Sequence, residues 1–145
     1  MAEPDDPRRA HRVLLADDEP LSRSMTERVL AKHGFDVVAV RDGAEALDAA
    51  GSAPFDAIVM DCQMPVMDGF QATTAIRAHE RSTGAGRTPI IGLSGRSMEG
   101  DRENALERGM DAYLTKPVNA RRLRAVLDSW ISGDRTDDGA PPIGA

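Results

Sequence analysis

The sequence predicts a single α/β domain in which helices cover both faces of a parallel β-sheet. Short apolar runs alternate with amphipathic segments five times along the chain, as expected for strand-helix units joined by right-handed crossovers. The apolar runs are continuous, which is typical of strands buried on both faces. With 145 residues, 41% of them hydrophobic, the chain is long enough for one compact domain of ordinary size.

The first strand and helix follow a polar segment, residues 1–11, which we expect to be a disordered N-terminal tail. The strand covers Arg12–Ala16, and Pro20 is well suited to the first turn of the helix after it. Apolar residues at helical spacing predict that this helix buries one stripe until Gly34 ends it. The residues of this stripe are Leu21, Met25, Val29 and Leu30.

The second and third strand-helix units repeat this order. The second strand is predicted over residues 35–40, and its helix begins at Asp42, where Glu45 completes a capping-box-like pattern, and continues to Gly51. The third strand is a short apolar run that stops at Asp61, which places this acid at the carboxyl end of a strand. The third helix is marked by Phe70, Thr73 and Ile76.

The last two units bring further polar residues to the ends of strands. The fourth strand, residues 89–93, ends in Ser94, and a fourth helix is predicted over residues 98–108. The fifth strand, Ala112–Thr115, is followed directly by Lys116. The last helix has the clearest amphipathic pattern in the chain. Its apolar face consists of Leu123, Val126, Leu127 and Trp130.

Composition limits the classes of function that need to be considered. The formal net charge of -6 offers no basic patch for nucleic acid or for an anionic membrane surface, so we expect neither as a direct partner. Cys62, the single cysteine, cannot form an internal disulfide, and no apolar stretch reads as a signal or a bilayer span, so we expect a cytoplasmic protein. Residues 133–145 are predicted to be a disordered tail, which leaves residues 12–132 as the folded domain.

Polar side chains stand at the carboxyl ends of four of the five predicted strands. They are Asp17 and Asp18 after the first strand, Asp61 at the third, Ser94 at the fourth and Lys116 after the fifth. In a flavodoxin-like doubly wound sheet with strand order 2-1-3-4-5, all these ends lie on one edge, and the first and third strands are neighbours at the switch point. The three acids should therefore share one crevice.

The chemistry of this set favours metal-assisted phosphoryl transfer. Three carboxylates repel one another unless a cation neutralises them, and their oxygens suit a hard ion such as Mg²⁺. Lys116 and the Ser94 hydroxyl could bind a phosphoryl group on an aspartate. Singly, each residue has an ordinary interpretation as a helix cap, a loop acid or a solvated charge. The combination is what predicts an aspartyl phosphate site.

The motifs that contain these residues carry a family resemblance. They read VLLADDEP, IVMDCQMPVMDGF, PIIGLS and GMDAYLTKP. Over about residues 12–132, the chain resembles the response regulator receiver domains of two-component signalling. It is most similar to the receivers attached to hybrid histidine kinases. One departure is Gly95, where such receivers commonly carry alanine.

The resemblance implies a role for each residue of the acidic site. Asp61 would be the phosphoacceptor, which receives its phosphoryl group from a histidine kinase or a histidine phosphotransfer domain. Mg²⁺ or Mn²⁺ would be held by Asp61, by Asp18 directly, by Asp17 through water and by the backbone carbonyl of Gln63. In this role the chain is a signalling phosphoacceptor of a phosphorelay and not an independent enzyme.

The resemblance also implies how phosphorylation becomes a signal. Ser94 and Lys116 would bind the phosphoryl oxygens, and Tyr113 would be the aromatic switch partner of Ser94. The bond before Pro117 would be cis. The face formed by the fourth helix, fifth strand and fifth helix would be remodelled, and this face could also form a homodimer.

Three other functions make different demands on the same residues. A phosphatase with an aspartyl nucleophile needs a second acid two positions after Asp61, where Gln63 stands. A flavin-binding carrier needs a loop rich in Gly, Ser or Thr after the first strand, where the sequence is ADDEP. The remaining alternative is a receiver that acts as a constitutive docking module, and labelling with acetyl phosphate separates it from a phosphoacceptor.

Overall fold

The structure, a computed structural model of the 145-residue chain, describes residues 10–95 and 101–132. Its elements are β1 (Arg12–Ala16), α1 (Pro20–Lys32), β2 (Asp36–Val40), α2 (Gly43–Ser52), β3 (Ala57–Asp61), α3 (Gly69–Thr83), β4 (Ile90–Ser94), α4 (Asp101–Glu107), β5 (Ala112–Thr115) and α5 (Ala120–Ser132). The two predicted tails lie almost entirely outside the described residues, as does the predicted start of the fourth helix at residues 98–100.

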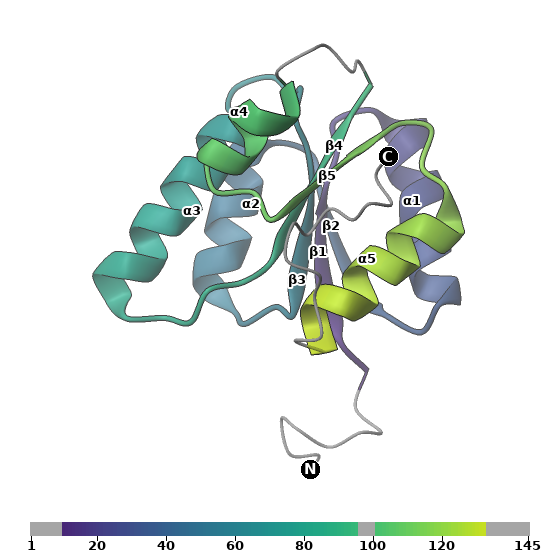
Figure 1. The fold of residues 1–145 in the computed structure, drawn as a ribbon, viewed down its shortest axis with the longest axis horizontal. Helices are drawn as coiled ribbons and strands as arrows, with labels where there is room; N and C mark the ends of the chain where they lie inside the picture. Colours follow the sequence, from purple (N-terminus) through teal and green to yellow (C-terminus); the bar gives the residue numbers. More distant parts are fainter. Residues whose placement is uncertain (1–9, 96–100, 133–145) are drawn as a thin grey trace.

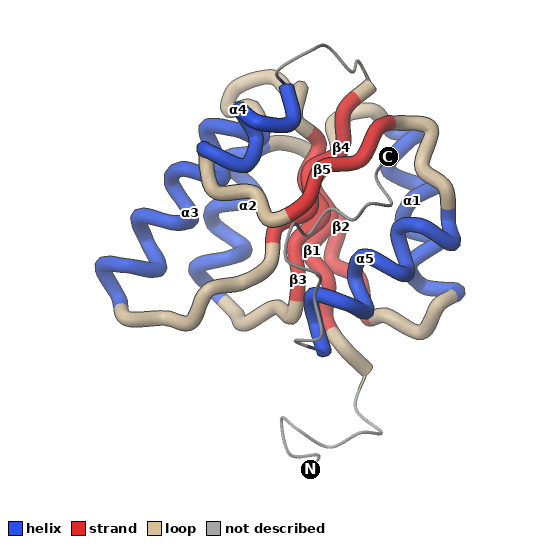
Figure 2. The backbone as a smooth tube through the Cα atoms, viewed as in Figure 1, coloured by secondary structure: helices blue, strands red, loops and turns tan. Residues whose placement is uncertain are grey.

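The five strands form one parallel sheet in the order β2-β1-β3-β4-β5, which confirms the predicted fold class. Figure 1 shows α2, α3 and α4 on one side of this sheet and α1 and α5 on the other. The tube in Figure 2 shows the same three layers, with the strands between two groups of helices. Residues at the carboxyl ends of the strands are in register, since Asp61 pairs with Leu93 and Ser94 pairs with Thr115. The edge that carries the predicted site is therefore built by neighbouring strands.

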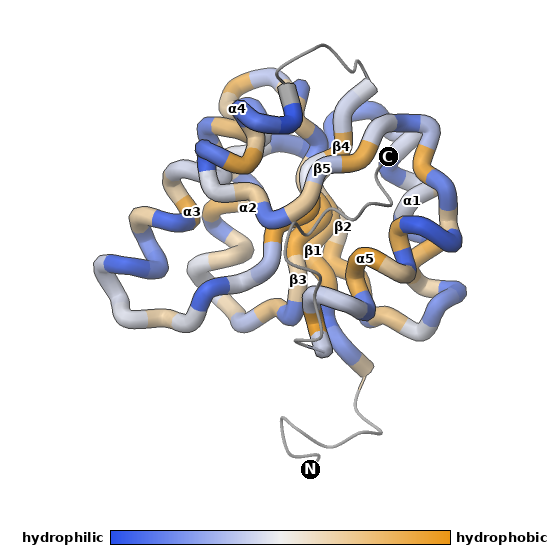
Figure 3. The backbone as a smooth tube through the Cα atoms, viewed as in Figure 1, coloured by the Kyte–Doolittle hydropathy of each residue, from blue (hydrophilic) through white to orange (hydrophobic). Residues whose placement is uncertain are grey.

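Alternate residues of the buried strands supply two hydrophobic cores, one on each face of the sheet. Leu14 and Ile58 face the side of α2, α3 and α4, whereas Leu15 and Val59 face the side of α1 and α5. All four are at most 1% exposed. Figure 3 shows the apolar residues concentrated in the sheet and the polar ones on the outer sides of the helices. No helix within the described ranges combines the length and the apolar character needed to cross a bilayer.

The helix starts agree only in part with the predicted capping. The Asp42 carboxylate accepts a hydrogen bond from the Glu45 backbone N at 2.8 Å, as expected for an N-cap. The Glu45 side chain, however, accepts from the Arg41 backbone N and not from that of Asp42. A complete capping box instead opens α3, where Asp68 and Gln71 each bond the other's backbone N.

The prediction that α1 buries Leu21 and Met25 is wrong, because these side chains are 67% and 58% exposed. The buried residues of α1 are Thr26 and Leu30. Two stripes of residues repeat every four positions along this helix: Leu21, Met25 and Val29, and Ser22, Thr26 and Leu30. Because neighbouring residues are about 100° apart around the helix axis, the two stripes face different directions. The stripe that faces the sheet begins at Ser22, one position after Leu21. Spacing alone could not choose between the two stripes.

A buried ionic network that the sequence did not suggest joins α3 to the loop before β5. Arg77 is 5% exposed and donates hydrogen bonds to four residues. The acceptors are the carbonyl oxygens of Gly109 and Thr88 and the carboxylates of Glu80 and Asp111. Asp111 also accepts from the Arg87 guanidinium and from the Ile90 backbone N. The network therefore holds the starts of β4 and β5, at the edge of the sheet opposite to Asp61.

Candidate functional site

Asp61 is the last residue of β3, and its side chain is 5% exposed. Its Oδ1 accepts a hydrogen bond from the Gln63 backbone N at 3.1 Å. Its Oδ2 accepts one from Nζ of Lys116 at 3.2 Å. A buried carboxylate with one donor on each oxygen is held in a single orientation.

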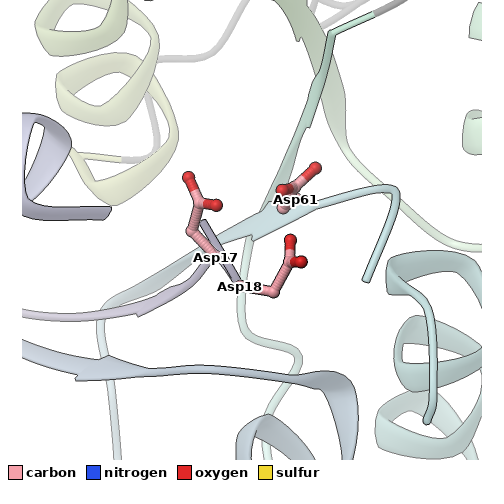
Figure 4. Close-up of side chains that lie close together, drawn as sticks. All are labelled: Asp17, Asp18 and Asp61. Atoms are coloured by element: carbon pink, nitrogen blue, oxygen red, sulfur yellow. The ribbon is translucent and has the colours of Figure 1, made fainter. Parts of the chain in front are cut away.

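Asp17 and Asp18 follow β1 directly and complete an acidic cluster with Asp61. Each of the three side chains offers a carboxylate oxygen, and these oxygens lie within 4.8 Å of one another. Figure 4 shows the three acids close together where β1 and β3 end. Asp17 is fully buried, whereas Asp18 is exposed. The structure thus brings together the three carboxylates that the sequence placed on this edge.

Glu19, the third acid of the loop after β1, does not join this cluster. Its side chain accepts a hydrogen bond from the Ser22 backbone N at 2.8 Å and so caps the start of α1. Of the three acids in this loop, only the first two carboxylates are therefore available to the site.

Among the residues that the structure describes, Lys116 places its ammonium group between two of these acids. Its Nζ lies 3.2 Å from Oδ2 of Asp61 and 3.3 Å from Oδ2 of Asp17. Burial alone would lower the pKa of Lys116, but the charges of Asp61 and Asp17 raise it above its ordinary value. Lys116 is therefore a fixed positive charge at neutral pH.

The carboxyl group of Asp61 has a raised pKa. Burial raises this pKa from its ordinary 3.8 to about 6, and the nearby charge of Asp17 acts in the same direction. The hydrogen bond from Gln63 and the charge of Lys116 lower the pKa, but they do not outweigh burial. Within the part of the chain that the structure describes, one ammonium lies among three carboxylates, which leaves an excess of negative charge in the crevice.

These residues fit a hard divalent cation. The donor set is made of carboxylate oxygens, which Mg²⁺ prefers, and the excess negative charge would be neutralised by such an ion. The Asp18 carboxylate makes no hydrogen bond to another described residue, so its oxygens are free to bind a metal. Beside Asp18 lies an open hollow of about 410 Å³, whose lining includes Gln63 and Asp68. Of the three acids, Asp18 is the one that lines this hollow.

Gly69 allows α3 to start against the backbone of Asp61. A Cβ atom at this position would lie 2.2 Å from the Asp61 carbonyl oxygen and 2.9 Å from Cα of Cys62. No side chain fits there without moving the strand end or the helix. The Asp68-Gly69 pair of the sequence therefore serves the site by capping α3 and by permitting this close approach.

The remaining predicted residues lie on the same edge or just below it. Ser94 is the last residue of β4, which pairs with β3, and it is 1% exposed. Tyr113 lies in β5 and is 6% exposed, packed in the core on the side of α2, α3 and α4. The peptide bond between Lys116 and Pro117 is cis, as the resemblance implied. The Gln63 carbonyl remains a predicted ligand.

Ser22 is a site residue that the sequence analysis missed. Its hydroxyl donates a hydrogen bond of 2.6 Å to Oδ2 of Asp17. A serine five positions after the acid, in the first turn of the next helix, carries no recognisable motif. The contact is seen only once α1 is placed against the end of β1.

Comparison with protein families gives one result for nearly the whole folded part of the chain. The family model described as "Response regulator receiver domain" matches residues 13–128. The sensor protein GacS of Pseudomonas syringae pv. syringae is 43% identical over 122 residues, which cover 84% of this chain. Hybrid signal transduction histidine kinase I of Dictyostelium discoideum is 40% identical over 125 residues, which cover 83% of it. The matches span 14% and 7% of the lengths of these two relatives.

Solved structures agree with this result. The receiver domain of the sensor histidine kinase PA1611 of Pseudomonas aeruginosa is 40% identical and has a TM-score of 0.77, over 86% of this chain and 99% of that one. That structure holds a magnesium ion coordinated in its active site cleft. The receiver domain of Ssk1 of Saccharomyces cerevisiae, in a co-crystal with the histidine phosphotransfer protein Ypd1, is 27% identical with a TM-score of 0.80, over 86% and 91% of the two chains.

Proposed function

The chain belongs to the response regulator receiver domain family, and from this premise we propose that Asp61 accepts a phosphoryl group from a phosphohistidine. The donor is a histidine kinase or a histidine phosphotransfer domain. One observation carries the proposal: the buried Asp61 carboxylate ends β3 with Lys116 on one oxygen and two further acids within 4.8 Å. Such a site can bind a divalent cation and a phosphoryl group side by side.

The transfer exchanges one bond to phosphorus for another. An oxygen of the ionised Asp61 carboxylate attacks the phosphorus atom and forms the O–P bond of an acyl phosphate. The N–P bond to the partner's imidazole breaks, and its electron pair returns to the ring nitrogen. Nζ of Lys116 lies 3.2 Å from Oδ2 of the attacking carboxylate. Once the phosphoryl group is attached, this ammonium would stabilise the negative charge on the phosphoryl oxygens.

A divalent metal ion would be held by this chain's own oxygens. Asp18 and Asp61 would bind it directly, the Gln63 carbonyl would add a ligand, and Asp17 would act through water. The bound ion would neutralise charge on the transferred phosphoryl group. The magnesium ion in the active site cleft of the related PA1611 receiver supports a metal ion at this site.

The exposed apolar residues of α1 suggest where the partner docks. Leu21 and Met25 line a groove of about 440 Å³ that continues to Lys116 and Val118, next to the acidic site. We infer that the histidine-bearing partner covers this groove, because a partner seated there would bring its histidine close to Asp61. The co-crystal of Ypd1 with the Ssk1 receiver supports a partner of this class.

Ser94 and Tyr113 would convert the transfer into a signal. The Ser94 hydroxyl would donate a charge-assisted hydrogen bond to the phosphoryl group, worth about 1.5 to 3 kcal/mol. This bond would stabilise the arrangement that the structure already shows, with Tyr113 buried, and so shift an existing equilibrium of α4, β5 and α5. Leu106, 38% exposed on α4, belongs to the surface through which we propose that a partner or a second copy reads the change.

Acetyl phosphate, a small phosphodonor, tests the proposal without a partner protein. A phosphoacceptor takes one base-labile phosphoryl group in the presence of Mg²⁺ and loses this ability in Asp61→Asn. A constitutive docking module takes none.

A further inference from the structure

The hydrogen bond from Ser22 to Asp17 differs from the other contacts of the acidic site. At 2.6 Å between Oγ of Ser22 and Oδ2 of Asp17, it is shorter than the contacts that Lys116 makes with either acid. Distances in this range are typical of a hydroxyl that donates to an ionised carboxylate. Asp17 is fully buried, so the hydroxyl supplies a bond that solvent water does not replace.

Both oxygens of Asp17 are occupied by donors from the protein itself. Oδ2 accepts hydrogen bonds from Oγ of Ser22 and Nζ of Lys116. Oδ1 accepts a hydrogen bond from the Glu19 backbone N at 3.0 Å. Asp18, in contrast, makes no side-chain hydrogen bond within the described part of the chain and is exposed. The Asp17 carboxylate is therefore held in place by the protein, whereas the Asp18 carboxylate is open to a ligand.

We propose that Ser22 is a positioning residue, which fixes the Asp17 carboxylate so that Asp17 reaches the metal through water while Asp18 binds it directly. The inference rests on the proposed function and extends it to a residue outside the acidic cluster. With Ser22 in place, Asp17 cannot rotate toward the ion without breaking a short hydrogen bond, and Oδ2 stays beside Lys116. Lys116 is thereby kept between Asp17 and Asp61.

Without the hydroxyl, the Asp17 carboxylate would keep two donors and gain freedom to turn. The water that it orients for the metal would lose its fixed acceptor. Groups that orient ligands from outside the first coordination sphere typically contribute tenfold or more to metal affinity. We therefore expect Ser22→Ala to bind Mg²⁺ roughly tenfold more weakly than the wild-type chain.

The experiment is titration calorimetry of the full chain with Mg²⁺. The variants are Ser22→Ala, Ser22→Thr and, as a matched control on the same helix, Ser24→Ala, whose side chain is exposed. We expect Ser22→Thr, which keeps a hydroxyl, and Ser24→Ala to bind as the wild type does. Thermal unfolding without metal verifies that each variant is folded.

An Asp18→Ala arm separates this inference from the proposed function. If Asp18→Ala binds Mg²⁺ unchanged, the metal site is misassigned and both fail. If Asp18→Ala loses binding while Ser22→Ala binds like the wild type, Ser22 has no positioning role and the proposed function stands. An equal loss in Ser22→Ala and Ser22→Thr would also overturn the inference, because it would assign the effect to packing and not to the hydroxyl.

Discussion

Nζ of Lys116 lies 3.2 Å from Oδ2 of Asp61, across 55 positions of sequence. The same nitrogen lies 3.3 Å from Oδ2 of Asp17, so one positive charge is shared by two buried carboxylates. Lys116 therefore cannot neutralise both acids, and burial keeps the pKa of Asp61 raised to about 6. This imbalance favours binding of a second positive charge and has a measurable consequence for stability.

We predict that Asp61→Asn is more stable than the wild type at pH 7.5 without magnesium. The folded chain keeps the Asp61 proton up to about pH 6, whereas the unfolded chain releases it near 3.8. The folded state thus binds more protons in this window, and the wild type loses stability as the pH rises from about 4 to above 6. Asparagine does not ionise. The pKa of about 6 already includes the effect of Lys116, and each pKa unit corresponds to about 1.4 kcal/mol, so we expect a gain of roughly 2 to 3 kcal/mol, or several degrees in Tm.

The measurement is thermal unfolding of both proteins between pH 4 and pH 8. The difference in Tm should vanish near pH 4, where the wild-type carboxyl is also protonated. Asp48→Asn, which changes an exposed acid on α2, is the matched control and should show no such pH dependence. A constant difference between wild type and Asp61→Asn at every pH would contradict the raised pKa.

The second prediction concerns Ser94→Ala. Asp17, Asp18 and Lys116 are unchanged in this variant, so we expect Asp61 still to accept a phosphoryl group. The charge-assisted hydrogen bond from Ser94 is lost, and with it the stabilisation that moves α4 and α5. Amide NMR of both proteins with and without beryllofluoride, which mimics the phosphoryl group, measures the response. Equally large shifts along α4 and α5 in the variant would mean that the signal leaves by another route.

The third prediction concerns the exposed apolar residues of α1. The double variant Leu21→Ser with Met25→Ser should accept a phosphoryl group from acetyl phosphate as the wild type does. Transfer from a phosphorylated histidine-containing partner should fall by roughly tenfold or more, since each buried apolar side chain contributes about 1.5 to 3 kcal/mol. Leu106→Ser, which changes an exposed apolar residue of α4, is the control. Unchanged transfer in the double variant would place the partner elsewhere.

The fourth prediction compares the stability contributed by a buried ion pair with that of an exposed one. Arg77→Leu leaves the buried Asp111 without one of its two guanidinium partners, and we expect a loss of about 3 to 5 kcal/mol in the free energy of unfolding. Arg124→Leu breaks an exposed pair with Asp128 and should cost less than about 1 kcal/mol. Urea unfolding midpoints compare the two. Similar losses in both variants would show that burial adds nothing to this network.

Much of the fold could be predicted because each element has a local signal. The apolar runs of β1, β3 and β4 are buried on both faces, and the end of each strand is marked by a polar residue. The alternation of strands and helices implies a parallel sheet whose strands all end at one edge, and the order 2-1-3-4-5 comes from the flavodoxin-like fold. For the same reason Asp17, Asp61 and Lys116 could be assigned to one edge of the sheet before any distance was known.

Contacts that depend on how one element is rotated against another could not be predicted. Leu21 and Ser22 lie on two stripes of α1 with the same spacing, and only packing against the sheet decides which one faces inward. Arg77 and Asp111 meet between α3 and the loop before β5, and nothing in the sequence around either residue points to the other. The misassigned Leu21 is also the residue that marks the proposed docking surface. Neighbouring apolar residues that the fold leaves exposed as a patch are a common mark of a binding surface.

The central claim is that Asp61 is the phosphoacceptor, and intact mass spectrometry after incubation with acetyl phosphate and Mg²⁺ tests it most directly. The wild type should gain the mass of one phosphoryl group, and hydroxylamine, which cleaves acyl phosphates, should remove it. Asp61→Asn should keep the fold and gain nothing. The same adduct in Asp61→Asn, or one that hydroxylamine leaves in place on His11, His33 or His79, would contradict the account.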